Sequence, residues 1–202
     1  MDSAINIVSG LPRCGTSLMM QMLESGGVEV VTDSIRAADT DNPRGYYEFE
    51  KVKRIKQDAS WLPDTRGKAF KMVTQLLYDL PPNERYRIIL MERDLDEMLL
   101  SQEKMLERLG RGAAPREEMK RSFILHLERL HQWLGQQRNI EVLRVDYHDL
   151  VQEPEAQAER VCEFLGGKGN VERMTRTVDP SLYRNRKFLI DRPGDALAGD
   201  PA

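Results

Sequence analysis

The chain has 202 residues, and its 30 Lys and Arg residues against 33 Asp and Glu residues give a net charge of −3. With 40% hydrophobic and 31% charged residues, the composition excludes the collagen-like, disulfide-framework and intrinsically disordered classes. The charge balance argues against nucleic acid or an anionic membrane as the main partner, but it leaves room for a local basic pocket.

Metal sites and membrane segments are not expected. The two cysteines, Cys14 and Cys162, are too few for a disulfide scaffold or a zinc site of their own. His126 and His131 lie five positions apart, which does not place them on one helix face as metal ligands. No apolar run approaches the ~20 residues of a membrane span, and the first residues lack the features of a signal peptide. We therefore expect a cytoplasmic protein.

Short apolar runs alternate with amphipathic stretches along the chain. In chain order, the expected elements are a strand at 4–9, a helix at 16–25, a strand at 28–31, a loop at 32–47, a helix at 48–60, strands at 68–74 and 86–92, helices at 94–109 and 117–135, a strand at 140–145 and a helix at 154–165. This alternation of buried-type strands with helices predicts a three-layer α/β fold, with a central parallel sheet of about five strands flanked by helices. We expect one domain over 1–190 and a flexible C-terminal tail over 191–202.

The loop after the first predicted strand has the features of a phosphate-binding loop. Gly10 and Gly15 have the spacing of the two glycines of a P-loop, and the next residue begins a helix. Backbone N–H groups and the helix dipole converge there and favour an anion. The Lys that a P-loop uses for the outer phosphates is replaced by Thr16, while a cation, Arg13, lies inside the loop. The alternative is a tight glycine turn with an ordinary helix cap.

Cys14 has two interpretations. A thiol at a helix N-terminus beside an arginine would have a depressed pKa and could act as a nucleophile. A cysteine phosphatase loop, however, places its arginine six positions after the cysteine, and here Arg13 precedes Cys14. The sequence therefore favours Cys14 as a small residue that fills the loop.

A second candidate anion site lies at the end of the strongest predicted strand. Arg93 closes this strand, Asp94 and Glu97 have the spacing of a capping box, and Ser101 follows Arg93 by eight positions. Ser101 lies nearly two turns beyond the cap and so on the same side of the helix. Arg93 and Ser101 can thus address one anion at the carboxyl edge of the sheet. The alternative is that Arg93 pairs with Glu92 or Asp94 and that Ser101 is solvated.

Together, the two motifs resemble those of the sulfotransferases that use 3′-phosphoadenosine 5′-phosphosulfate (PAPS). The family's loop P-[KR]-S-G-T-[TS] corresponds to residues 12–17, with cysteine in place of the usual serine. Its second motif, an arginine with a serine eight positions later, corresponds to Arg93 and Ser101. The segment 146–166 is similar to the family's Y-E-D-L segment and the helix after it, and 182–186 falls where the family often has a basic loop. The resemblance spans most of the chain in order.

The resemblance implies a role for each matching residue. The donor-binding residues would be Pro12, Arg13, Cys14, Gly15, Thr16, Ser17, Arg93, Ser101, Tyr147, Arg184 and Arg186. The loop would hold the 5′-phosphosulfate, Arg93 and Ser101 the 3′-phosphate, and Tyr147 the adenine. Arg13 and Lys71 would stabilise the charge that develops on the leaving phosphate. PAPS would be the cofactor, and no metal would be required.

The acceptor side of the reaction is less well defined by the sequence. One branch of the family has a K-x-H segment after the third strand, and the corresponding run here, from Lys71, has no histidine. Glu48 is the candidate general base, although it can equally begin a helix and favour the helix dipole. Tyr46 and Tyr47 flank Glu48, and the segments 32–66 and 105–120 are expected to build the acceptor pocket.

The function predicted from the sequence is transfer of a sulfuryl group from PAPS to a hydroxyl or amine of a small-molecule or other soluble acceptor. Two alternatives remain open: a nucleotide kinase or NTPase with a degenerate P-loop, and a non-catalytic nucleotide-binding member of the same fold. The sequence predicts no oligomeric state.

Overall fold

Residues 4–33, 45–112 and 114–183 are described by the structure, which is a computed structural model. Within these residues the sheet has four strands in the order β2-β1-β3-β4, all parallel to their neighbours. The strands are β1 (Ile5–Gly10), β2 (Ala69–Val73), β3 (Tyr86–Glu92) and β4 (Ile140–Asp146). The predicted parallel α/β fold is confirmed. The predicted strand at 28–31 is wrong: Val30 forms an isolated bridge to Ala69, at the edge of the sheet.

Four helices lie within one or two residues of the predicted bounds, and two short helices, at 147–152 and 171–177, were not predicted. They are α1 (Thr16–Ser25), α2 (Leu95–Arg108), α3 (Arg116–Leu134), α4 (Tyr147–Gln152), α5 (Pro154–Phe164) and α6 (Val171–Thr177). The helix predicted over 48–60 is wrong, because a short 3-10 helix, η1 (Glu50–Arg54), takes its place. Val52 and Ile55 are both buried, which anchors this short segment against the core; a spacing of three residues is compatible with a 3-10 helix as well as with an α-helix.

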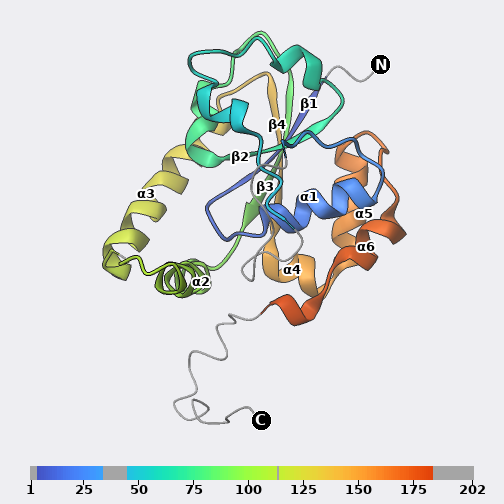
Figure 1. The fold of residues 1–202 in the computed structure, drawn as a ribbon. Helices are drawn as coiled ribbons and strands as arrows, with labels where there is room; N and C mark the ends of the chain where they lie inside the picture. Colours follow the sequence, from blue (N-terminus) through green and yellow to red (C-terminus); the bar gives the residue numbers. More distant parts are fainter. Residues whose placement is uncertain (1–3, 34–44, 113, 184–202) are drawn as a thin grey trace.

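Helices cover both faces of the sheet (Figure 1). One buried cluster lies under α1, α5 and α6 and includes Leu11 and Cys14 of the loop after β1. A second cluster lies on the other face, where Leu130 and Leu134 of α3 pack with Trp61. The predicted three-layer arrangement is therefore present.

The register of the strands determines where the loops meet. All six residues of β1 are buried, as expected of a central parallel strand. Gly10 pairs with Val73 of β2 and with Met91 of β3, so three strands end at one edge of the sheet. From β1 the chain goes to β2 on one side of β1 and then returns to β3 on the other side. Open α/β sheets bind ligands at the carboxyl ends of the strands where the chain reverses in this way, here next to β1.

In the part of the chain that the structure describes, no helix has the length and hydrophobicity needed to cross a membrane. The predicted tail at 191–202 and the candidate residues Arg184 and Arg186 lie outside the described residues.

Candidate functional site

The loop after β1 requires glycine at two positions. A Cβ atom on Gly10 would lie 2.8 Å from the Met91 carbonyl oxygen in β3. Gly15 has a φ of 90°, and a Cβ atom there would lie 2.3 Å from a ring carbon of Tyr147. The first glycine lets the loop leave the sheet beside β3, and the second lets the tyrosine ring pack directly on the loop.

Arg13 joins the two motifs that the sequence identified separately. Its φ of 68° is unusual for a residue other than glycine. Its Nε donates a hydrogen bond to Ser101 Oγ, 3.1 Å away in α2 and 88 positions along the chain. Its carbonyl oxygen accepts a hydrogen bond of 3.2 Å from Arg93. Ser101 is 4% exposed, so the alternative of a solvated serine does not hold.

Arg93 is buried and held from several sides. Its side chain forms an ion pair of 3.3 Å with Glu97, and the two side chains are 8% and 5% exposed. Its guanidinium carbon lies 4.6 Å from the ring centroid of Tyr147 and 5.2 Å from that of Tyr183. Tyr183 also donates a hydrogen bond of 2.7 Å to Glu97. Burial and this contact with Glu97 raise the pKa of Tyr183, so the phenol is neutral at physiological pH.

Asp94 caps the start of α2, as the sequence predicts. The Asp94 side chain accepts hydrogen bonds from the backbone N–H groups of Asp96 and Glu97. The Glu97 carboxylate also belongs to the cluster around Arg93. The sequence analysis did not identify Glu97 or Tyr183 as site residues. The one available signal was Arg93, four positions before Glu97, because oppositely charged side chains at this spacing can form an ion pair.

Lys71 lies at the same edge of the sheet and contacts neutral groups. Its ammonium group donates to the Tyr46 carbonyl oxygen and, at 3.4 Å, to Ser17 Oγ at the start of α1. Ser17 also donates to the Tyr46 carbonyl, at 3.3 Å. Lys71 and Ser17, predicted from separate segments, are thus brought together beside the loop. Pro12 is exposed, whereas Thr16 is half-buried.

Cys14 is unsuited to act as a nucleophile. Its side chain is 2% exposed, and burial raises the pKa of the thiol to about 12, against the opposing effect of Arg93. A thiol with this pKa is protonated at neutral pH. The geometry favours the interpretation of Cys14 as a small residue that fills the loop.

The candidate base Glu48 lies in an extended segment just before η1. The side chain is half-buried, and the backbone carbonyl accepts hydrogen bonds from Thr32 Oγ1 and the Asp33 N–H at 2.9 and 3.0 Å. Glu48 therefore does not begin a helix. Tyr46, next to it, is buried, and the Tyr47 hydroxyl donates to Glu24 of α1. The segment from Tyr46 to Glu48 is thus held by Ser17 and Glu24 near the two ends of α1, by Lys71 of β2 and by residues 32–33.

Tyr147, predicted to contact an adenine, begins α4 and is 8% exposed. Its ring lies against Gly15 and over Arg93 and forms an edge contact of 5.1 Å with Tyr183. The Tyr147 ring thus packs against both the loop and the Arg93 side chain.

His126 is a further polar residue near this edge that the sequence did not single out for the site. Its Nε2 lies 2.9 Å from the hydroxyl of Thr74, the residue after β2. Burial lowers the pKa of His126, so the imidazole is neutral at physiological pH. Contacts with residues far apart in sequence create this environment, and no local pattern around His126 indicates it.

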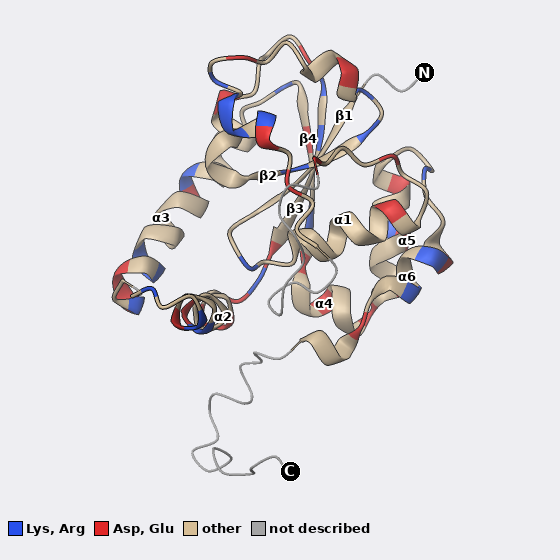
Figure 2. Cartoon of the chain, viewed as in Figure 1, with Lys and Arg blue, Asp and Glu red and all other residues tan. Residues whose placement is uncertain are grey.

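Acidic and basic residues are interspersed on α2 and α3 (Figure 2). Positive charge near the loop comes from individual side chains, Arg13, Lys71 and Arg93, rather than from an extended basic face. Within residues 4–33, 45–112 and 114–183, no group of three or more potential metal-ligating residues is found.

The fold defines a parallel α/β protein with a glycine-bounded loop between β1 and α1 at the carboxyl edge of its sheet. Residues 45–168 match the sequence profile of the sulfotransferase family. The match covers more than half of the 202 residues, and the chain belongs to this family. Among curated protein sequences, none matches the chain.

Solved structures agree with this assignment at the level of the fold. The sulfotransferase domain from the curacin biosynthetic pathway is 16% identical, with 89% of each chain covered and a TM-score of 0.56. A sulfotransferase from Alicyclobacillus acidocaldarius is 16% identical over 83% of this chain and 84% of its own, with a TM-score of 0.47. A sugar kinase from Janibacter is 13% identical over 89% of this chain and 98% of its own, with a TM-score of 0.40. The fold assignment rests on the curacin-pathway domain.

Proposed function

We propose that this protein transfers a sulfuryl group from PAPS to a hydroxyl or amine of an acceptor molecule. The observation that carries the proposal is the hydrogen bond from Arg13 to Ser101. It joins the loop assigned to the 5′-phosphosulfate to the helix assigned to the 3′-phosphate, as one ligand with phosphates at both ends requires.

The donor-binding roles follow from the side chains at this edge. The backbone N–H groups from Cys14 to Ser17 would bind the 5′-phosphosulfate at the start of α1. The Lys71 ammonium group would exchange its hydrogen bonds to the Tyr46 carbonyl and Ser17 for one to a phosphate oxygen, because a charged acceptor binds an ammonium group more strongly than neutral acceptors do. Arg93 and Ser101 would bind the 3′-phosphate, with Arg184 and Arg186 as further ligands.

The reaction itself needs charge stabilisation and a proton acceptor. The acceptor O–H bond breaks, a new O–S bond forms, and the S–O bond to the 5′-phosphate breaks, with its electron pair leaving on adenosine 3′,5′-bisphosphate. Glu48 would take the proton, and Arg13 and Lys71 would stabilise the charge on the departing phosphate. No step requires a metal ion.

Ligand-dependent thermal stability tests the donor assignment. A ligand that binds the folded state raises the melting temperature. We expect adenosine 3′,5′-bisphosphate to raise it without Mg²⁺, and by more than ATP or GTP does. A larger response to Mg-ATP would instead support a degenerate kinase, and no response to the bisphosphate would overturn the proposal.

Turnover separates an enzyme from a non-catalytic nucleotide-binding member of the family. In the presence of an acceptor, PAPS should be converted to the bisphosphate, and Glu48→Gln should abolish this conversion while PAPS still raises the melting temperature. Full turnover by Glu48→Gln would show that the base is assigned wrongly.

A further inference from the structure

Tyr183 connects the C-terminal part of the described chain to the proposed donor site. It follows the short 3-10 helix η4 (Pro180–Leu182) and is 4% exposed. Its ring packs in a small buried cluster with Tyr147 and Val151 of α4. Because the Tyr147 ring also lies against Gly15, this cluster holds Tyr183 in the interior beside the loop after β1.

The Tyr183 hydroxyl begins a series of contacts that ends at Arg93. It donates a hydrogen bond of 2.7 Å to Glu97 Oε2, and the same oxygen accepts from Arg93 Nε at 3.3 Å. A carboxylate oxygen has two lone pairs and can accept both hydrogen bonds. The hydroxyl also lies 3.4 Å from His148 Nδ1. Since the side chains of Arg93 and Glu97 are 8% and 5% exposed, water competes little for either contact with the carboxylate.

These contacts fix the plane of the Arg93 guanidinium group. Glu97 contacts it at Nε, and the Arg13 carbonyl oxygen accepts from Nη1 at 3.2 Å. The rings of Tyr147 and Tyr183 lie 4.6 and 5.2 Å from its central carbon. The terminal torsion of a glutamate side chain has only a weak preference of its own, so the Glu97 carboxylate takes the orientation that its hydrogen bonds impose. The Tyr183 hydroxyl therefore orients Glu97 and, through it, Arg93.

The orientation of the guanidinium group matters for a phosphate ligand. Arginine binds phosphate most strongly through two parallel N–H groups, and this geometry requires the guanidinium plane to point at the ligand. A guanidinium group that can tilt keeps its charge but loses the second of these hydrogen bonds. The loss would affect only a ligand that carries a 3′-phosphate, because this is the group assigned to Arg93.

We propose that Tyr183 is a positioning residue for the 3′-phosphate: by holding Glu97, it fixes Arg93 in the orientation that distinguishes nucleotides with a 3′-phosphate from those without one. Tyr183 acts through Glu97 and not by contact with the ligand. The inference rests on the proposed function for the identity of the nucleotide, but it concerns binding alone and is measured without any turnover.

The ratio of two affinities tests this role. Adenosine 3′,5′-bisphosphate and adenosine 5′-monophosphate differ only in the 3′-phosphate, so the ratio of their dissociation constants measures what that group contributes to binding. Tyr183→Phe keeps the ring against Tyr147 and Arg93 and removes the hydroxyl. In calorimetric titrations, we expect this variant to bind the bisphosphate about tenfold more weakly, at the lower end of the effect of one hydrogen bond to a charged group, and the monophosphate as before. An unchanged ratio, or equal weakening of both ligands, would overturn the proposal.

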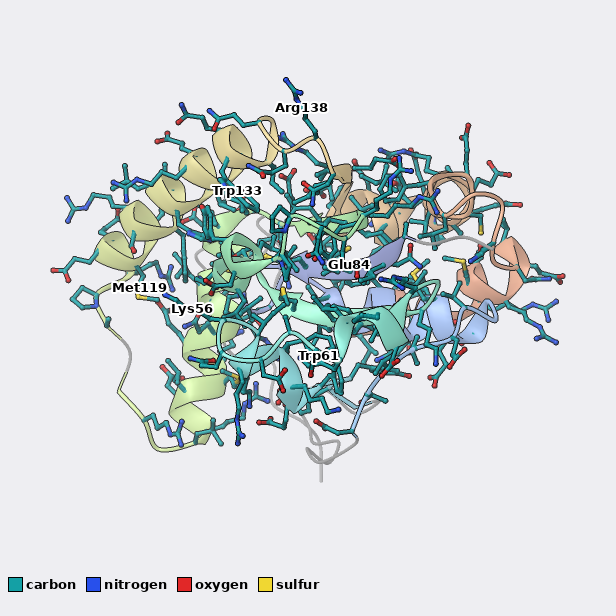
Figure 3. The ribbon with its side chains drawn as sticks, turned by 90° about the horizontal axis from the view of Figure 1, so that it is seen from above. Lys56, Trp61, Glu84, Met119, Trp133 and Arg138 are labelled. Carbon is teal, nitrogen blue, oxygen red and sulfur yellow. The ribbon has the colours of Figure 1, made fainter. Side chains whose placement is uncertain are left out.

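Tyr86→Phe is the matched control, because it removes a buried tyrosine hydroxyl from a different part of the molecule. Tyr86 lies at the amino edge of the sheet, the edge that faces the viewer in Figure 3, two positions after the labelled Glu84. Its hydroxyl donates a hydrogen bond of 2.9 Å to the Pro81 carbonyl oxygen. The control should lower the melting temperature, as Tyr183→Phe does, and leave the ratio of affinities unchanged. A ratio that falls equally in both variants would show that lost stability, and not the orientation of Arg93, reduces the selectivity.

A double variant tests whether Tyr183 acts through Glu97. Glu97→Gln replaces the carboxylate by a neutral amide with a single oxygen, so the ion pair with Arg93 is lost. If the two residues act in series, Tyr183→Phe should change the ratio of affinities much less in the Glu97→Gln background than in the unaltered protein. Full additivity of the two effects would show that Tyr183 acts independently of Glu97 and would overturn the proposed route.

Failure of this inference and failure of the proposed function have different signatures. An unaltered protein that binds the bisphosphate no more tightly than the monophosphate would overturn both, because Arg93 would then not bind a 3′-phosphate. An unaltered protein with a clear preference for the bisphosphate, whose Tyr183→Phe variant retains that preference, would keep the donor assignment and overturn only the positioning role of Tyr183.

Discussion

Arg93 after β3 and Lys71 in β2 lie at the same edge of the sheet and are held in different ways. Arg93 is buried against the rings of Tyr147 and Tyr183 and paired with the carboxylate of Glu97. Lys71 is half-buried and donates to a carbonyl and a hydroxyl. The buried ion pair of Arg93 stabilises the structure around it in addition to the proposed contact with the 3′-phosphate, whereas the less buried ammonium group of Lys71 can turn toward an anionic ligand at a lower cost.

The largest expected effect is on folding and concerns Arg93. Arg93→Ala leaves Glu97 buried without its cation, which costs about 3–5 kcal/mol. Chemical denaturation should show this loss. The control is Arg176→Ala, which breaks the Arg176–Glu172 ion pair, with side chains 75% and 69% exposed, and should cost less than about 1 kcal/mol.

A double variant distinguishes a lost ion pair from a lost side chain. Arg93→Met with Glu97→Gln removes both charges and leaves an acceptor for Tyr183, so most of the stability should return. If the double variant is as unstable as Arg93→Ala, packing of the guanidinium between the rings, rather than charge pairing, dominates at this position.

A somewhat smaller effect is expected from the glycine that lies against the Arg93 cluster. Gly15→Ala combines a left-handed backbone, which costs about 1–2 kcal/mol, with displacement of the Tyr147 ring, which adds about 1–3 kcal/mol. Gly27→Ala is the matched control, since its φ is 88° and no atom of the described residues lies within 4 Å of the added Cβ. Equal losses of unfolding free energy would show that Tyr147 does not press on the loop.

Substitution of Lys71 should change the affinity for the bisphosphate more than it changes the stability of the fold. Lys71→Met should weaken binding of adenosine 3′,5′-bisphosphate about tenfold, or 1.4 kcal/mol, and shift the melting temperature little. Lys68→Met, near the opposite end of β2 in an ion pair with Glu29, tests whether net charge alone explains the change. Calorimetric titration with adenosine 3′,5′-bisphosphate measures the affinity of both variants. A large loss of stability with unchanged affinity in Lys71→Met would remove the distinction between the two cations.

The smallest effect concerns pH and His126 of α3, which contacts Thr74 just after β2. Burial lowers the pKa of His126 in the folded protein below its usual 6.5, so the unfolded chain binds more protons below that pH. The contribution of this residue to stability is therefore full above about pH 6.5 and falls as the pH drops through that value. Urea denaturation at pH 5 and 7.5 should show a weaker pH dependence for His126→Gln than for the unaltered protein. An identical dependence would place its protonation outside the folding equilibrium.

Local sequence patterns predicted the elements that depend on local physics. The helix after Gly15, the cap at Asp94 and the apolar stripes of α3 and α5 follow from residues a few positions apart, and they were predicted within one or two residues. The short helices α4 and α6 were not predicted, and the predicted elements at 28–31 and 48–60 were wrong. There, burial of a few side chains such as Val52 and Ile55 decides the backbone geometry, and no periodic pattern extends far enough to show it.

By itself, the sequence determined the parallel fold and the position of the glycine-bounded loop after β1, because glycine spacing and helical periodicity are local and the strands are distinctly apolar. Only the tertiary structure decided what each cation contacts: Glu97 and Tyr183 around Arg93, the Tyr46 carbonyl at Lys71 and Ser101 at Arg13. These contacts join segments that lie far apart in the chain, and their energies depend on burial, which the sequence does not specify residue by residue.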